Sequence, residues 1–207
     1  MRSLFPFRLL RRGVLAFWTT TILVVSMASP VMSAWGNEPA TRPDAAAVRR
    51  SEQRYQVPTV KVLTADGRAQ ALRPLLDDGR PVVLTFLYTS CTTVCPVTSH
   101  VIDEFMRALG SEAKQVNVVS VSIDPDHDTV ARLAEHARSR GAQGSFVTGD
   151  PQSSETVQRA FDAWRGDKMN HDAVIFLRTP ASPVWVRLDG LVSPRRLLDE
   201  FRRLKPA

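Results

Sequence analysis

Two cysteines, Cys91 and Cys95, are the only ones among the 207 residues, and they lie four positions apart. In an oxidising compartment a lone cysteine pair most often forms a structural disulfide, but such a bridge stabilises most when it closes a long loop. The loop between these two residues is tiny, so a reactive or metal-binding pair is the better hypothesis. Two thiolates suit a soft ion, above all Cu(I), and one added imidazole extends the site to Cu(II) or Zn(II).

The cysteines follow the apolar run Val82–Tyr88, whose β-branched and aromatic residues predict a strand buried on both faces. Apolar residues then recur at helical spacing from Val97 to Leu109, and Pro96 fits the first turn of such a helix. Cysteines at i and i+4 near a first helical turn can point to the same side, and the helix N-terminus lowers thiol pKa and favours the thiolate.

A third ligand must come from elsewhere, and the sequence holds four histidines. His171 lies in a polar loop directly before the predicted strand Ala173–Leu177, so the fold could hold it rigidly beside the end of another strand. His100 lies on the predicted helix but off the face of the cysteines. His127 and His136 are expected to be solvated surface residues.

The rest of the chain alternates predicted strands and helices, which is typical of a compact α/β domain around a central sheet. A second buried strand is expected at Val116–Ile123, a short one at Phe146–Val147, and a hairpin at Ala173–Leu177 and Val184–Leu188. Helices are expected at Leu72–Leu76, Leu133–Arg138, Ser153–Trp164 and Ser193–Leu204.

The net charge of +6 is concentrated at the beginning of the chain. Met1–Arg12 contains four arginines and no acid, and no further charge appears before Glu38, so the remainder carries only +2. We therefore expect no nucleic-acid partner. A basic segment before the apolar run Val14–Val25 has the layout of an export signal, and the uncharged stretch is also long enough for a membrane anchor.

We accordingly expect residues 1–34 to be a signal peptide or membrane anchor, and an uncleaved segment would associate the protein with the membrane. The folded part is then exported: it is periplasmic, or anchored to the inner membrane facing the periplasm. Residues 35–55 contain two prolines and little to bury, which predicts a flexible linker. Residues 56–207 form the predicted folded domain.

The segment Tyr88–Pro96 resembles the Cys-x-x-x-Cys-Pro motif of the Sco/SenC family of copper chaperones. The turn Asp124–Thr129 is similar to the second signature of that family, and His171 falls where the family places its copper-binding histidine. The resemblance spans roughly Val57–Leu204.

The resemblance implies a thioredoxin-like fold in which Cys91, Cys95 and His171 are copper ligands and Asp124 is a supporting acidic residue. The family commonly has Asp-His-Ser around its ligand histidine, whereas this chain has Asn-His-Asp. Asp172 could therefore hydrogen-bond the imidazole or add negative charge near the metal.

Two functions remain open. In the first, which the resemblance implies, the protein is a metallochaperone that binds Cu(I) or Cu(II) and supplies it to the copper-containing subunit of a respiratory cytochrome oxidase. In the second, Cys91 and Cys95 are the redox-active pair of a thiol-disulfide oxidoreductase that reduces the cysteine pair of a copper-site partner. A thiol-disulfide reductase is then a further candidate partner. The three-residue spacer and the lack of a proline before Ala173 argue against a general thioredoxin-type reductase.

Overall fold

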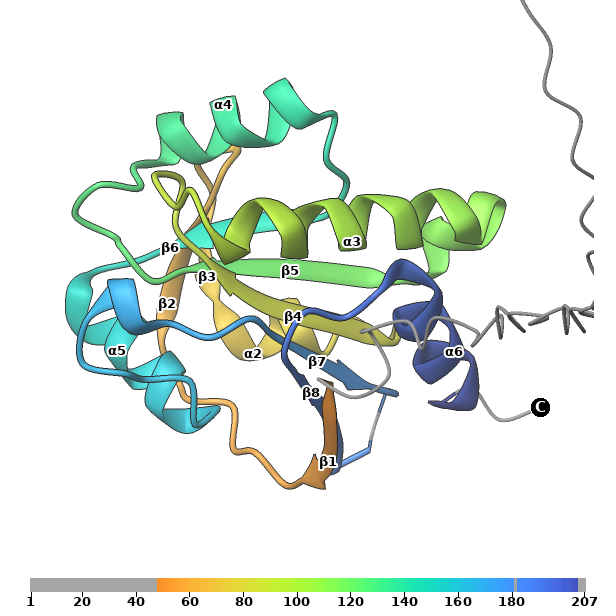
Figure 1. The fold of residues 1–207 in the computed structure, drawn as a ribbon. Coiled ribbons are helices and arrows are strands. Elements are labelled where there is room, and N and C mark those ends of the chain that lie inside the picture. The colour runs from red at the N-terminus through yellow and green to blue at the C-terminus, as the bar shows by residue number, and fades with distance from the viewer. Residues whose placement is uncertain (1–47, 181, 205–207) are drawn as a thin grey trace, which may run out of the picture. The chain divides into compact units, whose positions relative to one another are not determined.

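The computed structural model describes residues 48–180 and 182–204, which form an eight-stranded sheet with helices on both faces (Figure 1). The strands are β1 (Arg49–Gln53), β2 (Lys61–Thr64), β3 (Ala69–Ala71), β4 (Val82–Leu87), β5 (Asn117–Ser122), β6 (Ser145–Thr148), β7 (Val174–Arg178) and β8 (Trp185–Asp189). The helices are α2 (Leu72–Leu76), α3 (Val94–Leu109), η1 (Gly110–Gln115), α4 (Val130–Arg140), α5 (Pro151–Ala160), η2 (Lys168–Asn170) and α6 (Pro194–Leu204).

The predicted signal peptide or membrane anchor, residues 1–34, lies outside the described residues. Among the helices of the described ranges, none combines the length and the apolar character that crossing a membrane requires.

The strands lie in the order β1-β8-β7-β4-β5-β6-β2-β3. At the centre, β4 runs parallel to β5 and antiparallel to β7, and every residue of these three strands is buried. Burial on both faces explains their continuous apolar sequences, because helices cover both sides of the sheet. The expected thioredoxin-like α/β fold is confirmed.

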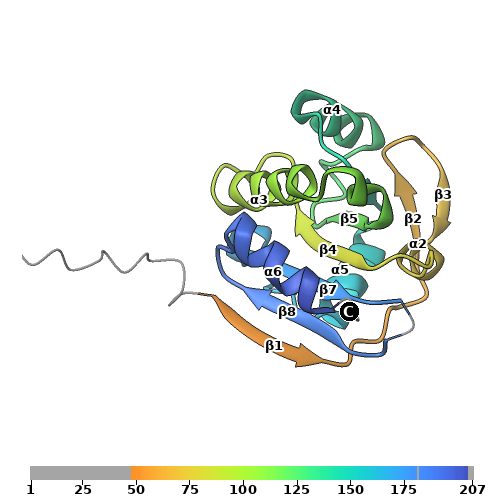
Figure 2. The ribbon, with the colours of Figure 1, turned by 90° about the vertical axis from the view of Figure 1, so that its right-hand side faces the viewer.

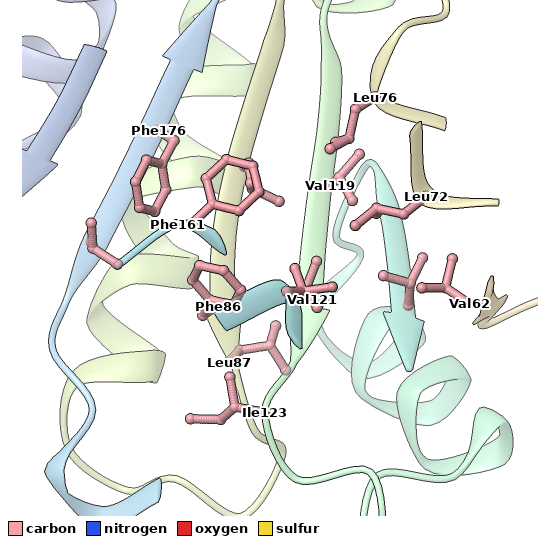
Figure 3. Close-up of a cluster of buried hydrophobic side chains, with 14 of the residues drawn as sticks. Val62, Leu72, Leu76, Phe86, Leu87, Val119, Val121, Ile123, Phe161 and Phe176 are labelled. Carbon is pink, nitrogen blue, oxygen red and sulfur yellow. The ribbon is translucent and has the colours of Figure 1, made fainter. Parts of the chain in front are cut away.

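The sheet packs against its helices through two apolar cores, one on each face. The helices α3 and α6 pack on one face, and α2 and α5 lie across the other (Figure 2). In the core under α2 and α5, Phe86, Phe161 and Phe176 make edge-to-face contacts with ring centroids 5.2–6.3 Å apart (Figure 3). On the opposite face, Phe105 of α3 meets Phe201 of α6 at 5.3 Å. Because these cores fix both β4 and α3, the two ends of the loop that joins them are held in place.

The end of the expected linker 35–55 is folded, so this part of the prediction was wrong. β1 pairs antiparallel with β8 along all five of its residues, and the following Tyr55 is buried with its ring 5.3 Å from that of Phe161. A strand at the edge of a sheet can expose nearly all of its side chains, and β1 does so. Backbone hydrogen bonds to β8 and the ion pair of Arg50 with the buried Glu200 hold β1 in place, and hydrophobic patterning reveals neither.

Candidate metal centre

The cysteines lie at the junction between the end of β4 and the start of α3. Cys91 is in the connecting loop and Cys95 is in the first turn of the helix, and both are buried and free of a disulfide. The Cys91 N–H donates to the carbonyl of Tyr88 at 3.1 Å, which tightens the loop. The Cys95 N–H donates to Cys91 Sγ at 3.4 Å, so one of the unpaired donors of the helix N-terminus is satisfied by sulfur. Pro96 follows in the first turn, where the missing N–H costs little.

His171 lies in the short segment between η2 and β7, and β7 is the neighbour of β4 in the sheet. Its Nδ1 lies 2.9 Å from the backbone carbonyl of Lys168, and its Nε2 lies 3.1 Å from Cys95 Sγ. A carbonyl oxygen only accepts, so Nδ1 donates and the lone pair of the neutral ring is on Nε2. The nitrogen that faces the cysteines is therefore the one able to bind a metal.

The donor atoms of Cys91, Cys95 and His171 all lie within 4.8 Å of one another. Sulfur and nitrogen donors bind an ion such as Zn²⁺ at about 2.0–2.3 Å, so donors that share one ion are separated by about 4–4.6 Å at most. A small inward movement of these side chains would complete such a site. Two sulfurs and one imidazole nitrogen form a soft donor set that suits copper or zinc rather than magnesium or calcium.

The two thiols differ in acidity. Burial raises the pKa of Cys91. Hydrogen bonds from the backbone N–H groups of Cys95 and Thr93 help to lower it, and the lowering outweighs the effect of burial, so the pKa of Cys91 is about 7. Burial also raises the pKa of Cys95, and the neighbouring Cys91 raises it again, so that it lies well above its ordinary value of 9.0. The expected lowering of thiol pKa at the helix N-terminus is confirmed for Cys91 and wrong for Cys95.

This asymmetry predicts selective alkylation of Cys91 in the reduced, metal-free protein. The thiolate is the reactive form, so the iodoacetamide rate should rise with pH and level off above a midpoint near 7. Peptide mapping by mass spectrometry at several pH values checks both the site and the midpoint. Preferential labelling of Cys95, or a midpoint near 9, would contradict the assignment.

A charged pair supports the histidine loop without joining the donors. The Lys168 ammonium bonds the carboxylate of Asp124 and lies 5.7 Å from the ring centroid of Tyr88. The Tyr88 ring in turn meets the imidazole of His171 edge-to-face at 5.1 Å. Because the Lys168 carbonyl also receives the imidazole N–H, Asp124 acts on His171 through the position of Lys168.

Asp128 is the residue of the site whose role sequence reasoning missed. Its side chain is fully buried and accepts hydrogen bonds from the backbone N–H of Thr89 at 3.1 Å, the Thr89 hydroxyl at 2.5 Å and the Ser122 hydroxyl at 2.7 Å. It thereby joins the start of the cysteine loop to the end of β5. The turn Asp124–Thr129 was noticed as a motif, and its second acid is the signal that could have found this anchor.

Asp172 bonds an arginine rather than the imidazole of His171. Its carboxylate accepts from Arg165 at 2.7 Å, and the imidazole N–H is already bonded to a backbone carbonyl. The suggestion that Asp172 hydrogen-bonds His171 was therefore wrong. The contact with Arg165 also offsets its negative charge.

The other three histidines lie apart from the cysteines. His100 is exposed on α3, and His127 contacts Arg132. His136 is half-buried, with its ring 5.8 Å from that of Phe146, so the expectation that it is a solvated surface residue was wrong. His136 is half-buried because α4 packs against β6, and its ring lies on the side of the helix that contacts Phe146 of β6.

Comparisons with known proteins agree with this site and fold. The model of the SCO1/SenC family matches residues 64–205. The SCO1 protein homolog of Bacillus subtilis is 29% identical over 127 residues, which are 58% of this chain, and the chain spans 64% of the length of that relative.

Among solved structures, copper-bound ScoI of Bradyrhizobium japonicum aligns with a TM-score of 0.57 at 24% identity, covering 72% of this chain and 98% of the other. BsSco, described as having a disulfide switch and as a member of the Sco family of cytochrome c oxidase assembly proteins, aligns with a TM-score of 0.62 at 21% identity. That alignment covers 74% of this chain and 95% of BsSco. These likenesses establish the fold.

Proposed function

Because the chain belongs to the SCO1/SenC family, we propose that it is a copper-binding metallochaperone that supplies copper to the copper-containing subunit of a respiratory cytochrome oxidase. The observation that carries this proposal is the convergence of Cys91 Sγ, Cys95 Sγ and His171 Nε2 within 4.8 Å. Cys95 and His171 are 76 residues apart in sequence, and the pairing of β7 with β4 brings their segments together.

The proposed chemistry is ligand exchange, with copper as the cargo. Cys91 and Cys95 supply the thiolates that retain Cu(I), and the His171 imidazole adds the nitrogen that helps to hold Cu(II). His171 is partly exposed while both cysteines are buried, so donors of the recipient meet the imidazole first. Replacing that neutral ligand before the thiolates gives copper a stepwise route out of the site.

The recipient and the compartment are inferred from different observations. A solved relative described as belonging to a family of cytochrome c oxidase assembly proteins supports the oxidase as the destination. The basic and then apolar pattern of residues 1–34 supports export, with the domain in the periplasm or anchored to the inner membrane facing it.

Copper titration of the reduced protein tests the chaperone proposal. We expect about one copper ion per chain for both oxidation states, because the three donors form a single site. The variant His171→Ala should lose about 10–100-fold in Cu(II) affinity and less in Cu(I) affinity, since both thiolates remain. His100→Ala removes an exposed histidine of α3 and is the matched control. Affinities that are equal in the wild type and His171→Ala for both ions would contradict the proposed site.

A second candidate function is reduction of a disulfide in a copper-site partner, favoured by the unequal acidity of the unbridged cysteines. The Cys91 thiolate would attack one partner sulfur, form a mixed disulfide and release the other partner sulfur as a thiolate. Cys95 would then lose its proton and attack Cys91 Sγ. That step frees the second partner thiolate and leaves a Cys91–Cys95 disulfide, so two electrons have passed to the partner.

Trapping distinguishes this redox function from ligand exchange alone. The variant Cys95→Ser should accumulate a mixed disulfide through Cys91 with an oxidised oxidase-subunit peptide, because the resolving thiol is missing. Cys91→Ser should trap far less, since the remaining thiol is buried and has a raised pKa. Absence of any mixed disulfide with Cys95→Ser would remove the redox function and leave metal transfer unaffected.

A further inference from the structure

A cavity of about 560 Å³ lies at the other end of the sheet from the cysteines. Its wall includes Arg178, the last residue of β7, which pairs in register with Val82, the first residue of β4. The cysteine loop begins at the opposite end of β4, after Leu87. The cavity is therefore separate from the metal-binding residues, and its chemistry is different.

The cavity wall is strongly basic. Four arginines line it, and they come from separate parts of the chain: Arg54, Arg73, Arg80 and Arg178. Asp77 is the acid on the same wall and bonds Arg178, while Arg80 bonds Asp78 at 2.5 Å. Arg73 donates to a backbone carbonyl, which carries no countercharge. Arg54 is exposed and bonds no side chain or backbone group of the described residues. Two positive charges are therefore left uncompensated around the cavity.

Arg178 is held as a rigid donor. The residue is only 8% exposed, its guanidinium lies 4.5 Å from the ring centroid of Trp185, and Nη2 donates to the Leu76 carbonyl at 3.3 Å. Its Nε is buried and has no hydrogen-bond partner among the residues that the structure describes. A planar guanidinium that stacking holds on the cavity wall is well suited to bind an oxyanion.

We propose that this cavity binds a small polyanion, with oxyanion groups of the phosphate or polycarboxylate type. The volume falls within the range of small-molecule sites, about 300–1,000 Å³, and the concave wall favours a compact ligand over an extended acidic peptide. Arg54 and Arg73 supply the uncompensated charge, and Arg178 supplies the fixed donor. The negative charge of Asp77 repels the anionic ligand and limits its affinity.

Calorimetric titration of the reduced, metal-free protein with inorganic pyrophosphate and with citrate tests this site. Arg54→Gln should weaken binding about threefold to tenfold, because one unpaired charge is lost. Asp77→Asn should strengthen it by a similar factor, since the amide oxygen can still accept from Arg178 while the repulsion disappears. A purely structural role for Asp77 would not produce tighter binding. Arg195→Gln removes an exposed arginine on α6 that bonds no described residue, and it is the matched control.

The two probes also distinguish a phosphate-bearing ligand from a polycarboxylate ligand. Binding of pyrophosphate alone assigns a phosphate-bearing ligand, binding of citrate alone assigns a polycarboxylate, and binding of both supports the shared oxyanion chemistry. Equal losses in Arg54→Gln and Arg195→Gln would overturn the site in favour of general surface charge. No binding of either probe, or tighter binding of a hexaglutamate peptide, would overturn the assignment to a small ligand. Copper affinity should be unchanged in all of these variants.

Discussion

Replacing Asp128 by alanine should lower the free energy of unfolding by about 2–4 kcal/mol and weaken copper binding about 10–100-fold. The carboxylate accepts hydrogen bonds from three donors in the protein interior, and the variant leaves the Thr89 N–H, the Thr89 hydroxyl and the Ser122 hydroxyl without this acceptor. Buried donors that lose a charged acceptor carry a desolvation cost. Copper affinity falls as well, because Thr89 begins the loop that positions Cys91. Urea unfolding and copper competition measure the two effects.

Asp103→Ala is the matched control for this prediction. Asp103 is a partly buried aspartate that pairs with Arg140 at 2.6 Å, but it lies on α3 away from the cysteine loop. Its loss removes a charge-assisted hydrogen bond and should cost about 1.5–3 kcal/mol, but it should leave copper affinity unchanged. Asp128→Asn keeps an acceptor for the Thr89 N–H and should fall between the wild type and Asp128→Ala. Copper affinity in Asp128→Ala equal to that in Asp103→Ala would contradict the role of Asp128 as the anchor of the loop.

Short-range patterns were enough to predict the junction of β4 and α3. The run Val82–Tyr88 has the composition of a doubly buried strand, and the recurrence of apolar residues from Val97 to Leu109 identifies a helix. The observed strand ends one residue before the predicted end, and the observed helix begins three residues before the predicted start. The two cysteines lie between these signals, so their place at a helix N-terminus follows from local sequence.

Contacts between distant segments were not predictable from local patterns. His171 meets Cys95 because β7 pairs with β4, and strand order is a property of the whole sheet. The resemblance to a family identified this histidine, whereas periodicity could not. The edge strand β1 was missed because its side chains are nearly all exposed. Asp128 was missed as an anchor because an acid in a turn looks solvated until its donors are known.

Replacing Cys95 by serine should reduce Cu(I) affinity by more than about 100-fold. Loss of a residue that only orients a metal ligand already lowers metal affinity about 10–100-fold. Here a ligand itself is lost, and the serine hydroxyl that replaces it is a poor donor for a soft ion. Cys91→Ser should cause a still larger loss near pH 7, because the remaining thiol, Cys95, has a raised pKa and must lose its proton to bind copper. Competition with a Cu(I) chelator measures both losses, and wild-type affinity in either variant would contradict the three-donor site.

The pH dependence should nevertheless distinguish these two variants. A thiol must lose its proton to bind copper, so affinity rises about tenfold per pH unit until the pH passes the thiol pKa. In Cys95→Ser the remaining thiol is Cys91, whose pKa is about 7, and the rise should flatten above that pH. In Cys91→Ser the remaining thiol is Cys95, whose pKa is raised first by burial, which the substitution leaves in place. Its copper affinity should therefore still be rising between pH 7 and pH 9, and equal slopes for the two variants over that range would show that the thiols do not differ in acidity.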